Sequence, residues 1–278
     1  MVHITPDRKA AFARDGFLVL PAISKEISHN IEKWANEVKN LPYRPDTWMH
    51  YDEVIKSSKS SSTEEKVLCR TENFADYHEG FKELFRGAEM TSILEQLTGE
   101  PMVLFKEKIN YEQPQAGGYQ AHIDSLGYRH IGNVSHLSIL MAAEPATLEN
   151  GCLEVVASSH KMSIPIDKNK CIQQEWCDEQ KWIPVPLESG QFLVFGSYLA
   201  HRSAPNKSDK GQAAIYATYN AISDGGDRRE AYYEDRRKLW PPTAERLPEE
   251  RYDAGAKIYG FGTPMLSIVE DGYKNSGL

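Results

Sequence analysis

The sequence predicts a mainly β protein with flanking helices, in which short strands form a barrel or sandwich. From Pro101 to Tyr219, short apolar segments alternate with turns rich in Gly, Pro and Asn, and strands at this density are typical of such folds. Before residue 100, apolar side chains recur every three or four residues instead, which indicates helices. The chain has 278 residues, of which 40% are hydrophobic, so it is long enough for one large domain with a sizeable core.

The first hundred residues are expected to be largely helical. Thr5 is of a type that caps helix N-termini, and Pro6 is favoured at the first helical position. A helix is therefore predicted from Pro6 to about Asp15, with Gly16 ending it. The elements expected in this region are helices at 6–15, 25–41 and 80–97, a buried strand at 17–20, and a serine-rich surface loop at 56–65.

The barrel core is predicted at about 101–222, followed by a coiled C-terminal wrap at about 223–278. Asn150-Gly151 is a sequence typical of a hairpin turn, since both residues tolerate positive φ. All of this is consistent with a single domain over residues 1–278. The strands expected in the core are 103–111, 136–143, 151–156, 183–185, 191–195 and 214–219.

Composition argues against several classes of function. The net charge is −8 with acidic and basic residues interspersed, whereas a general nucleic-acid binder would show a basic face. No secretory signal is evident, and no segment approaches the roughly 18 apolar residues that span a bilayer. The four cysteines lack zinc-site spacing and are expected to be reduced. We therefore expect a cytoplasmic protein, monomeric or homodimeric, without a nucleic-acid or membrane partner.

His122-Ile123-Asp124 is the motif that carries chemistry. On an extended strand, residues i and i+2 project to the same face, so the imidazole and the carboxylate would lie together. Non-haem iron(II) oxygenases use two imidazoles and one carboxylate and leave the remaining positions open. His201 follows 77 residues later, after an apolar segment, and is the candidate third ligand. An H-x-D pair alone is weak evidence, because such pairs also occur on solvated loops.

Several further motifs, in order along the chain, resemble the phytanoyl-CoA dioxygenase family of Fe(II)/2-oxoglutarate oxygenases. Within it the chain is most similar to the branch described as 2-aminoethylphosphonate dioxygenase-like, from about residue 11 to about residue 250. The segments that carry the resemblance are Arg14-Asp-Gly-Phe-Leu18, Arg70-Thr-Glu-Asn-Phe74, Leu104-Phe-Lys-Glu-Lys-Ile-Asn110, His122-Ile-Asp124, Glu149-Asn-Gly-Cys-Leu-Glu154, Ser158-Ser-His160, His201-Arg-Ser-Ala-Pro-Asn206 and Tyr216-Ala-Thr-Tyr-Asn220.

The resemblance implies a double-stranded β-helix, the jelly-roll barrel of cupin-like proteins. It also implies that His122, Asp124 and His201 are the metal ligands and catalytic centre, with Fe(II) and 2-oxoglutarate as cofactors. The expected reaction uses molecular oxygen to hydroxylate a C–H bond of a small molecule, with release of succinate and CO2. Asp124 argues against halogenation, since halogenases of this fold replace the carboxylate ligand with a small residue.

The sequence departs from the family where 2-oxoglutarate is anchored. Family members usually carry an arginine 11 or 12 residues after the distal histidine, and here those positions are Gln212 and Ala213. Glutamine offers neutral hydrogen bonds in place of a charged fork. We expect Arg70 and Lys108 to compensate, with Ser203 and Gln212 also at the cosubstrate.

Strand alternation is the basis for choosing Lys108. It would place Lys106, Lys108 and Asn110 on one face, with Phe105, Glu107 and Ile109 on the other. A face with two lysines near the metal motif suits an anionic ligand, but it is equally consistent with a solvent-facing side of the strand. Arg70, in turn, could simply pair with Glu72.

Three hypotheses about function follow. The first is a hydroxylase of a small polar anion, such as an aminophosphonate. The second is a natural-product oxygenase that hydroxylates, desaturates or rearranges its substrate. The third is a non-catalytic relative that binds metal but has lost normal 2-oxoglutarate use, and only the change at 212 and 213 supports it.

Overall fold

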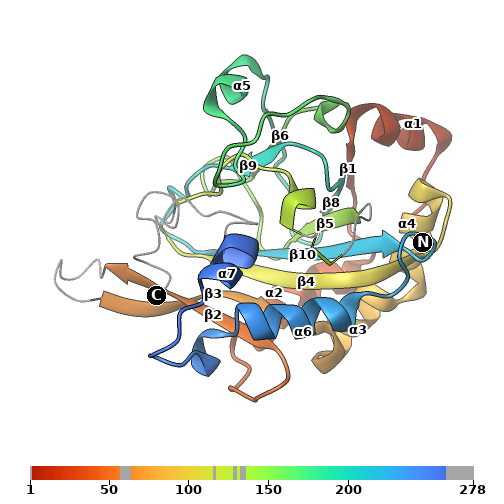
Figure 1. The fold of residues 1–278 in the computed structure, drawn as a ribbon. Coiled ribbons are helices and arrows are strands. Elements are labelled where there is room, and N and C mark those ends of the chain that lie inside the picture. Colours follow the sequence, from red (N-terminus) through yellow and green to blue (C-terminus); the bar gives the residue numbers. More distant parts are fainter. Residues whose placement is uncertain (1, 57–63, 115–116, 128–129, 132–135, 261–278) are drawn as a thin grey trace.

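Two antiparallel sheets form the body of the molecule (Figure 1). The structure is a computed structural model that describes residues 2–56, 64–114, 117–127, 130–131 and 136–260. The larger sheet has seven strands in the order β1-β8-β5-β10-β4-β3-β2, and the smaller has three in the order β7-β6-β9. The strands are β1 (Phe17–Leu20), β2 (Met49–Lys56), β3 (Glu64–Glu72), β4 (Met102–Glu112), β5 (His136–Ala142), β6 (Leu153–Val155), β7 (Ile183–Pro184), β8 (Phe192–Gly196), β9 (His201–Ser203) and β10 (Gln212–Ala221).

The helices pack mainly on the outer face of the large sheet. They are α1 (Pro6–Asp15), α2 (Lys25–Lys39), α3 (Glu79–Arg86), α4 (Ala88–Thr98), α5 (Gln174–Glu179), α6 (Arg229–Leu239) and α7 (Asp253–Gly255), with short helical turns η1 (Ala75–Tyr77), η2 (Asp124–Gly127), η3 (Ser159–Lys161), η4 (Thr243–Glu245) and η5 (Ala256–Gly260). The largest hydrophobic cluster joins α2, α3 and α4 to alternate residues of β4, β5 and β10. The other face of these strands turns toward the small sheet, where a separate cluster fills part of the space between the sheets.

The start of the chain folds as predicted. The Thr5 side chain accepts a hydrogen bond from the Arg8 backbone N–H, Pro6 begins the helix, and Gly16 ends it at φ 84°. A side chain at Gly16 would also meet the His160 ring, so both space and backbone require glycine there. The strand and the second helix lie where they were expected.

Other expectations for the first hundred residues were wrong or incomplete. The helix predicted at 80–97 is two helices, because Gly87 lies in an extended conformation between them. The hairpin of β2 and β3 was not predicted, since its residues are polar and charged and show no clear alternation. Most of the serine-rich loop lies outside the described residues.

In the second half, the expected strands are present, but one turn and the C-terminal tail differ from the expectation. Gly151 does adopt positive φ in a turn, yet this turn carries the chain from the large sheet to the small one and forms no hairpin. The tail was expected to be coil, but residues 229–239 form α6, which lies along the large sheet (Figure 1). The short strand β9 was also missed.

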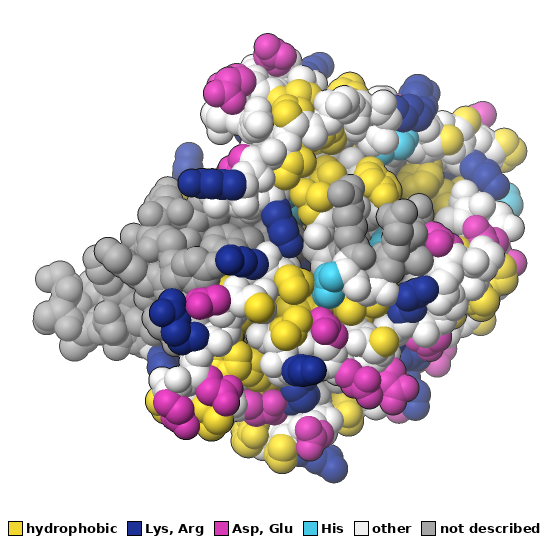
Figure 2. Space-filling view, in the orientation of Figure 1, with side chains coloured by type: hydrophobic (Ala, Val, Ile, Leu, Met, Phe, Trp, Pro, Cys, Tyr) yellow, Lys and Arg dark blue, Asp and Glu magenta, His cyan; other side chains and the backbone are white. Residues whose placement is uncertain are grey.

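The described surface carries mixed charge, and the cysteines are not paired with one another. Acidic and basic side chains are interspersed over the described part of the face that carries α6 (Figure 2). All four cysteines are free, as expected. No helix within the described ranges is long and apolar enough to span a bilayer.

Candidate active site

His122, Asp124 and His201 meet at the small-sheet side of the barrel. His122 and His201 are partners in an isolated β-bridge, and Asp124 begins the helical turn η2. Their ligand atoms all lie within 4.8 Å of one another. The Nε2 atoms of His122 and His201 are 3.8 Å and 3.7 Å from Asp124 Oδ1. The expectation that the H-x-D segment is extended was therefore wrong for Asp124, although the three groups do converge.

Each histidine is oriented by a backbone carbonyl. His122 Nδ1 lies 2.7 Å from the Gln120 oxygen, and His201 Nδ1 lies 2.9 Å from the Leu199 oxygen. Because a carbonyl oxygen only accepts, each Nδ1 carries the hydrogen and each Nε2 presents a lone pair to the centre. Burial lowers the pKa of His122 to about 3, which keeps this imidazole neutral.

Asp124 is held in the form that a metal requires. Burial opposes its ionisation, but His201 and His122 outweigh this effect, and its pKa falls to about 2. Ser138 on β5 donates a hydrogen bond to Asp124 Oδ2 at 3.2 Å and contacts Thr218 on β10 at the same distance. One carboxylate oxygen is thus engaged by the sheet while the other faces the histidines. Two imidazoles whose Nδ1 atoms are held by carbonyl oxygens, together with one carboxylate, all buried, fit a divalent iron ion.

A cluster of buried cations lies next to this centre. Its members come from β3, β4 and α6, and each interacts electrostatically with Glu72. We call Arg70, Lys106, Lys108 and Arg236 the cation cluster. Arg236 pairs with Glu72 at 2.6 Å, and Arg70 lies 3.5 Å from the same carboxylate.

Burial disfavours the charged form of both lysines in the cation cluster. It lowers the pKa of Lys106 to about 8, although Glu72 and Asp124 raise it. It lowers the pKa of Lys108 well below its usual value, with repulsion from Arg70 and Lys106 adding to the effect. An anion bound beside these lysines would favour their charged forms.

The alternation predicted for β4 was partly wrong. A β-bulge makes Thr218 the partner of Lys106 and Tyr219 the partner of Leu104, so Phe105 has no partner in the ladder. Phe105 then packs against His136 and Tyr232, away from the face of Glu107. Lys106, Lys108 and Asn110 do share the inner face, as expected.

The other predicted cosubstrate residues lie along the same interior. Ser203 follows His201 on β9 and accepts a hydrogen bond from the Tyr119 backbone N–H at 2.9 Å. Arg70 donates to Asn110 Oδ1 at 2.9 Å and reaches the Tyr119 hydroxyl at 3.5 Å. The Lys108 ammonium lies 4.8 Å from the centre of the Tyr216 ring, so this side chain reaches from β4 to the neighbouring strand β10.

Gln212 faces a small cavity that it shares with Ser203 and Tyr216. Its amide nitrogen donates to Glu112 Oε2 at 2.7 Å and to the Asn150 carbonyl at 2.6 Å, so both N–H groups are in use. Ala213 belongs to the outer hydrophobic cluster. Position 212 is therefore the inward one of the two at which an arginine was expected.

Several residues at this site were not predicted from the sequence. Glu112 could have been found, because alternation continues the inner face of β4 from Lys108 through Asn110 to residue 112. Arg236 carried no such signal, since its helix was not predicted. Ser138 lies in an apolar strand and gave no indication of contact with Asp124.

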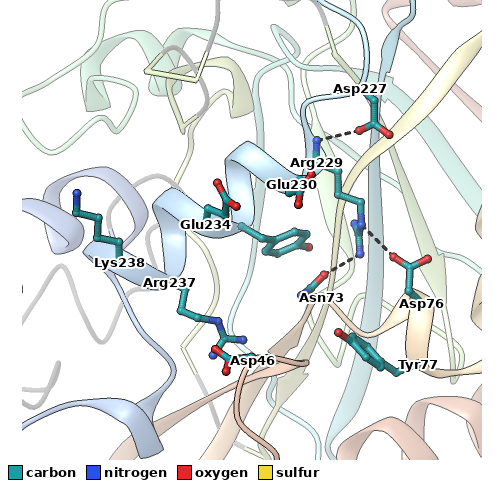
Figure 3. Close-up of a pocket in the computed structure, with 11 residues that line it drawn as sticks. Asp46, Asn73, Asp76, Tyr77, Asp227, Arg229, Glu230, Glu234, Arg237 and Lys238 are labelled. Carbon is teal, nitrogen blue, oxygen red and sulfur yellow. Dashed lines mark hydrogen bonds and ion pairs between the residues drawn. The ribbon is translucent and has the colours of Figure 1, made fainter.

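A larger cavity among the described residues lies on the outer side of β4 (Figure 3). His122, Asp124 and His201 do not line it, and its lining consists mainly of charged residues of α6 and of the segment after β3. Arg229 dominates it: the guanidinium pairs with the buried Glu107, donates to Asn73 at 3.0 Å, and lies 3.4 Å from Asp76. This network fastens the start of α6 to β4, so that Arg236 enters the cation cluster from the same helix.

Comparison with known proteins decides the family. The model of the phytanoyl-CoA dioxygenase (PhyH) family matches residues 12–214. The chain belongs to the phytanoyl-CoA dioxygenase family. It is 32% identical to a 2-aminoethylphosphonate dioxygenase from the uncultured bacterium HF130_AEPn_1, over 95% of this chain and 100% of that one. It is 35% identical to a methylphosphonate hydroxylase from Gimesia maris, over 84% of this chain and 87% of that one.

Comparison with solved structures confirms the predicted double-stranded β-helix. EctD from S. alaskensis, in a complex with 2-oxoglutarate and 5-hydroxyectoine, has a TM-score of 0.65 at 20% identity, covering 80% of this chain and 77% of that one. The same protein with bound iron also scores 0.65, at 19% identity over 81% and 80% of the two chains. The family match, the two relatives that act on phosphonates and the buried His-Asp-His group identify the chain as a non-haem iron dioxygenase that depends on 2-oxoglutarate, so the prediction of an enzyme with these cofactors is confirmed.

Proposed function

We propose that this dioxygenase hydroxylates a small organophosphonate, with His122, Asp124 and His201 as the iron ligands. The two phosphonate-acting relatives support the substrate class. When bound, iron and 2-oxoglutarate together supply the oxidising power: one oxygen atom of O2 enters succinate as CO2 is released, and the other enters the substrate. The residues of the chain must hold, orient and neutralise the two organic anions.

The observation that carries the proposal is the group of buried basic side chains beside the metal site. All four members of the cation cluster interact with Glu72, and both of its lysines also interact with Asp124. Burial disfavours the charged forms of these lysines, so an anion bound beside them would stabilise those forms. A phosphonate dianion offers more negative charge to this cluster than a carboxylate does.

We assign the cosubstrate to the side of the cation cluster that faces β10. Lys108 lies over Tyr216, which lines the same cavity as Ser203 and Gln212. Lys108 would supply the charge that an arginine supplies in relatives, and Ser203 a neutral hydrogen bond. Arg70 would act beside them by holding Asn110 and Tyr119. Lys106 and Arg236 would then face the phosphonate.

Succinate release with a matched panel tests the substrate class. Methylphosphonate, ethylphosphonate and 2-aminoethylphosphonate should stimulate 2-oxoglutarate turnover, whereas propionate, β-alanine and taurine, which offer the same alkyl groups with single negative charge, should not. The product of the best phosphonate should carry one added oxygen by mass spectrometry. Equal stimulation by the carboxylates, or by uncharged compounds alone, would reject a phosphonate substrate and favour the natural-product hypothesis.

A further inference from the structure

A buried carboxylate stands at the end of the cavity where relatives place an arginine. Glu112 is 6% exposed, and its Oε2 accepts the hydrogen bond from Gln212. The cavity beside it also contains Ser203, Tyr216 and Leu140. An ionised carboxylate there would repel the distal carboxylate of 2-oxoglutarate. The inference below rests on the proposed placement of this cosubstrate.

The groups around Glu112 do not stabilise its negative charge. Gln212 on β10 is neutral, and the Tyr119 and Tyr216 hydroxyl groups that interact with it are un-ionised. The second acid at this cavity is Glu144, which accepts a hydrogen bond from the Ala213 backbone N–H. The Lys108 ammonium lies over the Tyr216 ring, 4.8 Å from its centre. Burial accordingly raises the pKa of Glu112 to about 7, even though the Gln212 hydrogen bond lowers it.

We propose that Glu112 binds the distal carboxylate of 2-oxoglutarate as a neutral acid. Gln212 holds Oε2 as an acceptor, which leaves Oε1 to carry the proton and to donate it in a hydrogen bond to the cosubstrate. Two carboxyl groups that share a site cannot both ionise easily, so the second carboxylate favours this protonated state further. The proton is taken from solvent when 2-oxoglutarate binds and returns to solvent when succinate leaves.

The sign of the pH dependence follows directly. Below its folded pKa, Glu112 is already protonated and 2-oxoglutarate binds without a proton cost. Above that pKa, each pH unit should weaken binding about tenfold, because one proton must be taken up. With a pKa near 7, the dissociation constant should rise by about 25-fold between roughly pH 6.5 and 8.5.

Anaerobic titration of the iron(II) protein with 2-oxoglutarate measures this affinity through the visible band of the chelated keto acid. Calorimetry in two buffers of different ionisation heat counts the protons taken up. We expect about one proton per 2-oxoglutarate at pH 8 for the unmodified protein. Glu112→Gln keeps the size and supplies an N–H donor, so its affinity should change less than about threefold across the same pH range, with one proton fewer taken up.

Three variants separate Glu112 from its neighbours. Glu144→Gln removes the other acid of the cavity and should retain the full pH dependence. Lys108→Met removes the nearby amine and should weaken binding while the slope persists. Gln212→Ala should weaken binding at pH 6.5, because Glu112 loses its orientation. Circular dichroism checks that each variant is folded.

The outcomes distinguish this inference from the proposed function. A pH-independent affinity in the unmodified protein, or loss of the slope in Glu144→Gln instead of Glu112→Gln, overturns the role of Glu112 while 2-oxoglutarate binding stands. Failure of the unmodified iron protein to bind 2-oxoglutarate at any pH overturns the cosubstrate placement itself, and the role of Glu112 with it.

Discussion

Replacing Ser138 with alanine should weaken metal binding without unfolding the barrel. Ser138 is 1% exposed and donates to Asp124 Oδ2, the oxygen that faces away from the two histidines. The substitution removes one hydroxyl and leaves the backbone pairing of β5 with β10 intact. Asp124 then loses the hydrogen bond that fixes the orientation of its carboxylate. Metal binding must then fix that orientation without it.

The size of the effect can be bounded from the geometry. Hydrogen bonds to charged groups contribute about 1.5–3 kcal/mol, and losing a partner of a metal ligand typically costs about 10- to 100-fold in affinity. The Ser138–Asp124 distance is 3.2 Å, longer than the roughly 2.7–2.8 Å that hydroxyl donors prefer. The contact is therefore at the weak end of the range. We expect the metal dissociation constant to rise about 10- to 30-fold.

Cobalt(II), which is stable in air-free buffer and visible by absorbance, is a suitable probe in competition with a chelator. Ser125→Ala is the matched control: Ser125 is the neighbour of Asp124 and 5% exposed, and its hydroxyl has no hydrogen-bond partner among the described residues. That variant should bind cobalt within about threefold of the unmodified protein. Equal losses in both variants, or unchanged affinity in Ser138→Ala, would refute the orienting role.

Three further predictions follow from the charged groups. Arg229→Met leaves Glu107 buried without its partner and should cost about 3–5 kcal/mol, a fall in Tm of about 6–15 °C, whereas Arg14→Met at an exposed pair should leave the Tm nearly unchanged in the same calorimetric scan. Lys106→Met should raise the KM for a phosphonate at least tenfold while the 2-oxoglutarate dissociation constant changes little, and the reverse result would reassign Lys106 to the cosubstrate. Asp124→Ala should abolish saturable cobalt binding, and retention of a stoichiometric site would exclude Asp124 as a ligand.

The parts of the fold that local sequence determines were the predictable ones. The first helix is set by a capping threonine, a proline and a glycine within twelve residues, and all three act as expected. The three residues that converge in the candidate metal site were also named from the sequence, because H-x-D and a later histidine after an apolar segment are local signals. Strand density indicated a barrel or sandwich, and the resemblance to the family implied the double-stranded β-helix, without knowledge of strand order.

The parts that depend on distant contacts were not predictable in this way. Arg236 and Glu72 are 164 residues apart in sequence, and nothing local marks either as half of a buried pair. The strand pair β2 and β3 is polar in sequence because its inner face carries charges for the site, so it lacks the usual apolar alternation. The bulge at Phe105 arises from pairing with β10 and re-aims one side chain without a Gly or Pro to signal it.

The change at position 212 is best understood together with Glu112. An arginine at 212 would lie beside the Glu112 carboxylate and form an ion pair with it, which would spend much of its charge before a cosubstrate arrived. Glutamine instead leaves Glu112 with one neutral partner, so burial favours the protonated acid. The positive charge is supplied from β4 by Lys108, which lies over the Tyr216 ring. In this arrangement Glu112 is close to neutral in the empty barrel, so the cost of burying it is small, and bound 2-oxoglutarate favours its protonated form further. The change at position 212 therefore makes the charge of the cosubstrate site depend on ligand binding. The site can still hold a dianion.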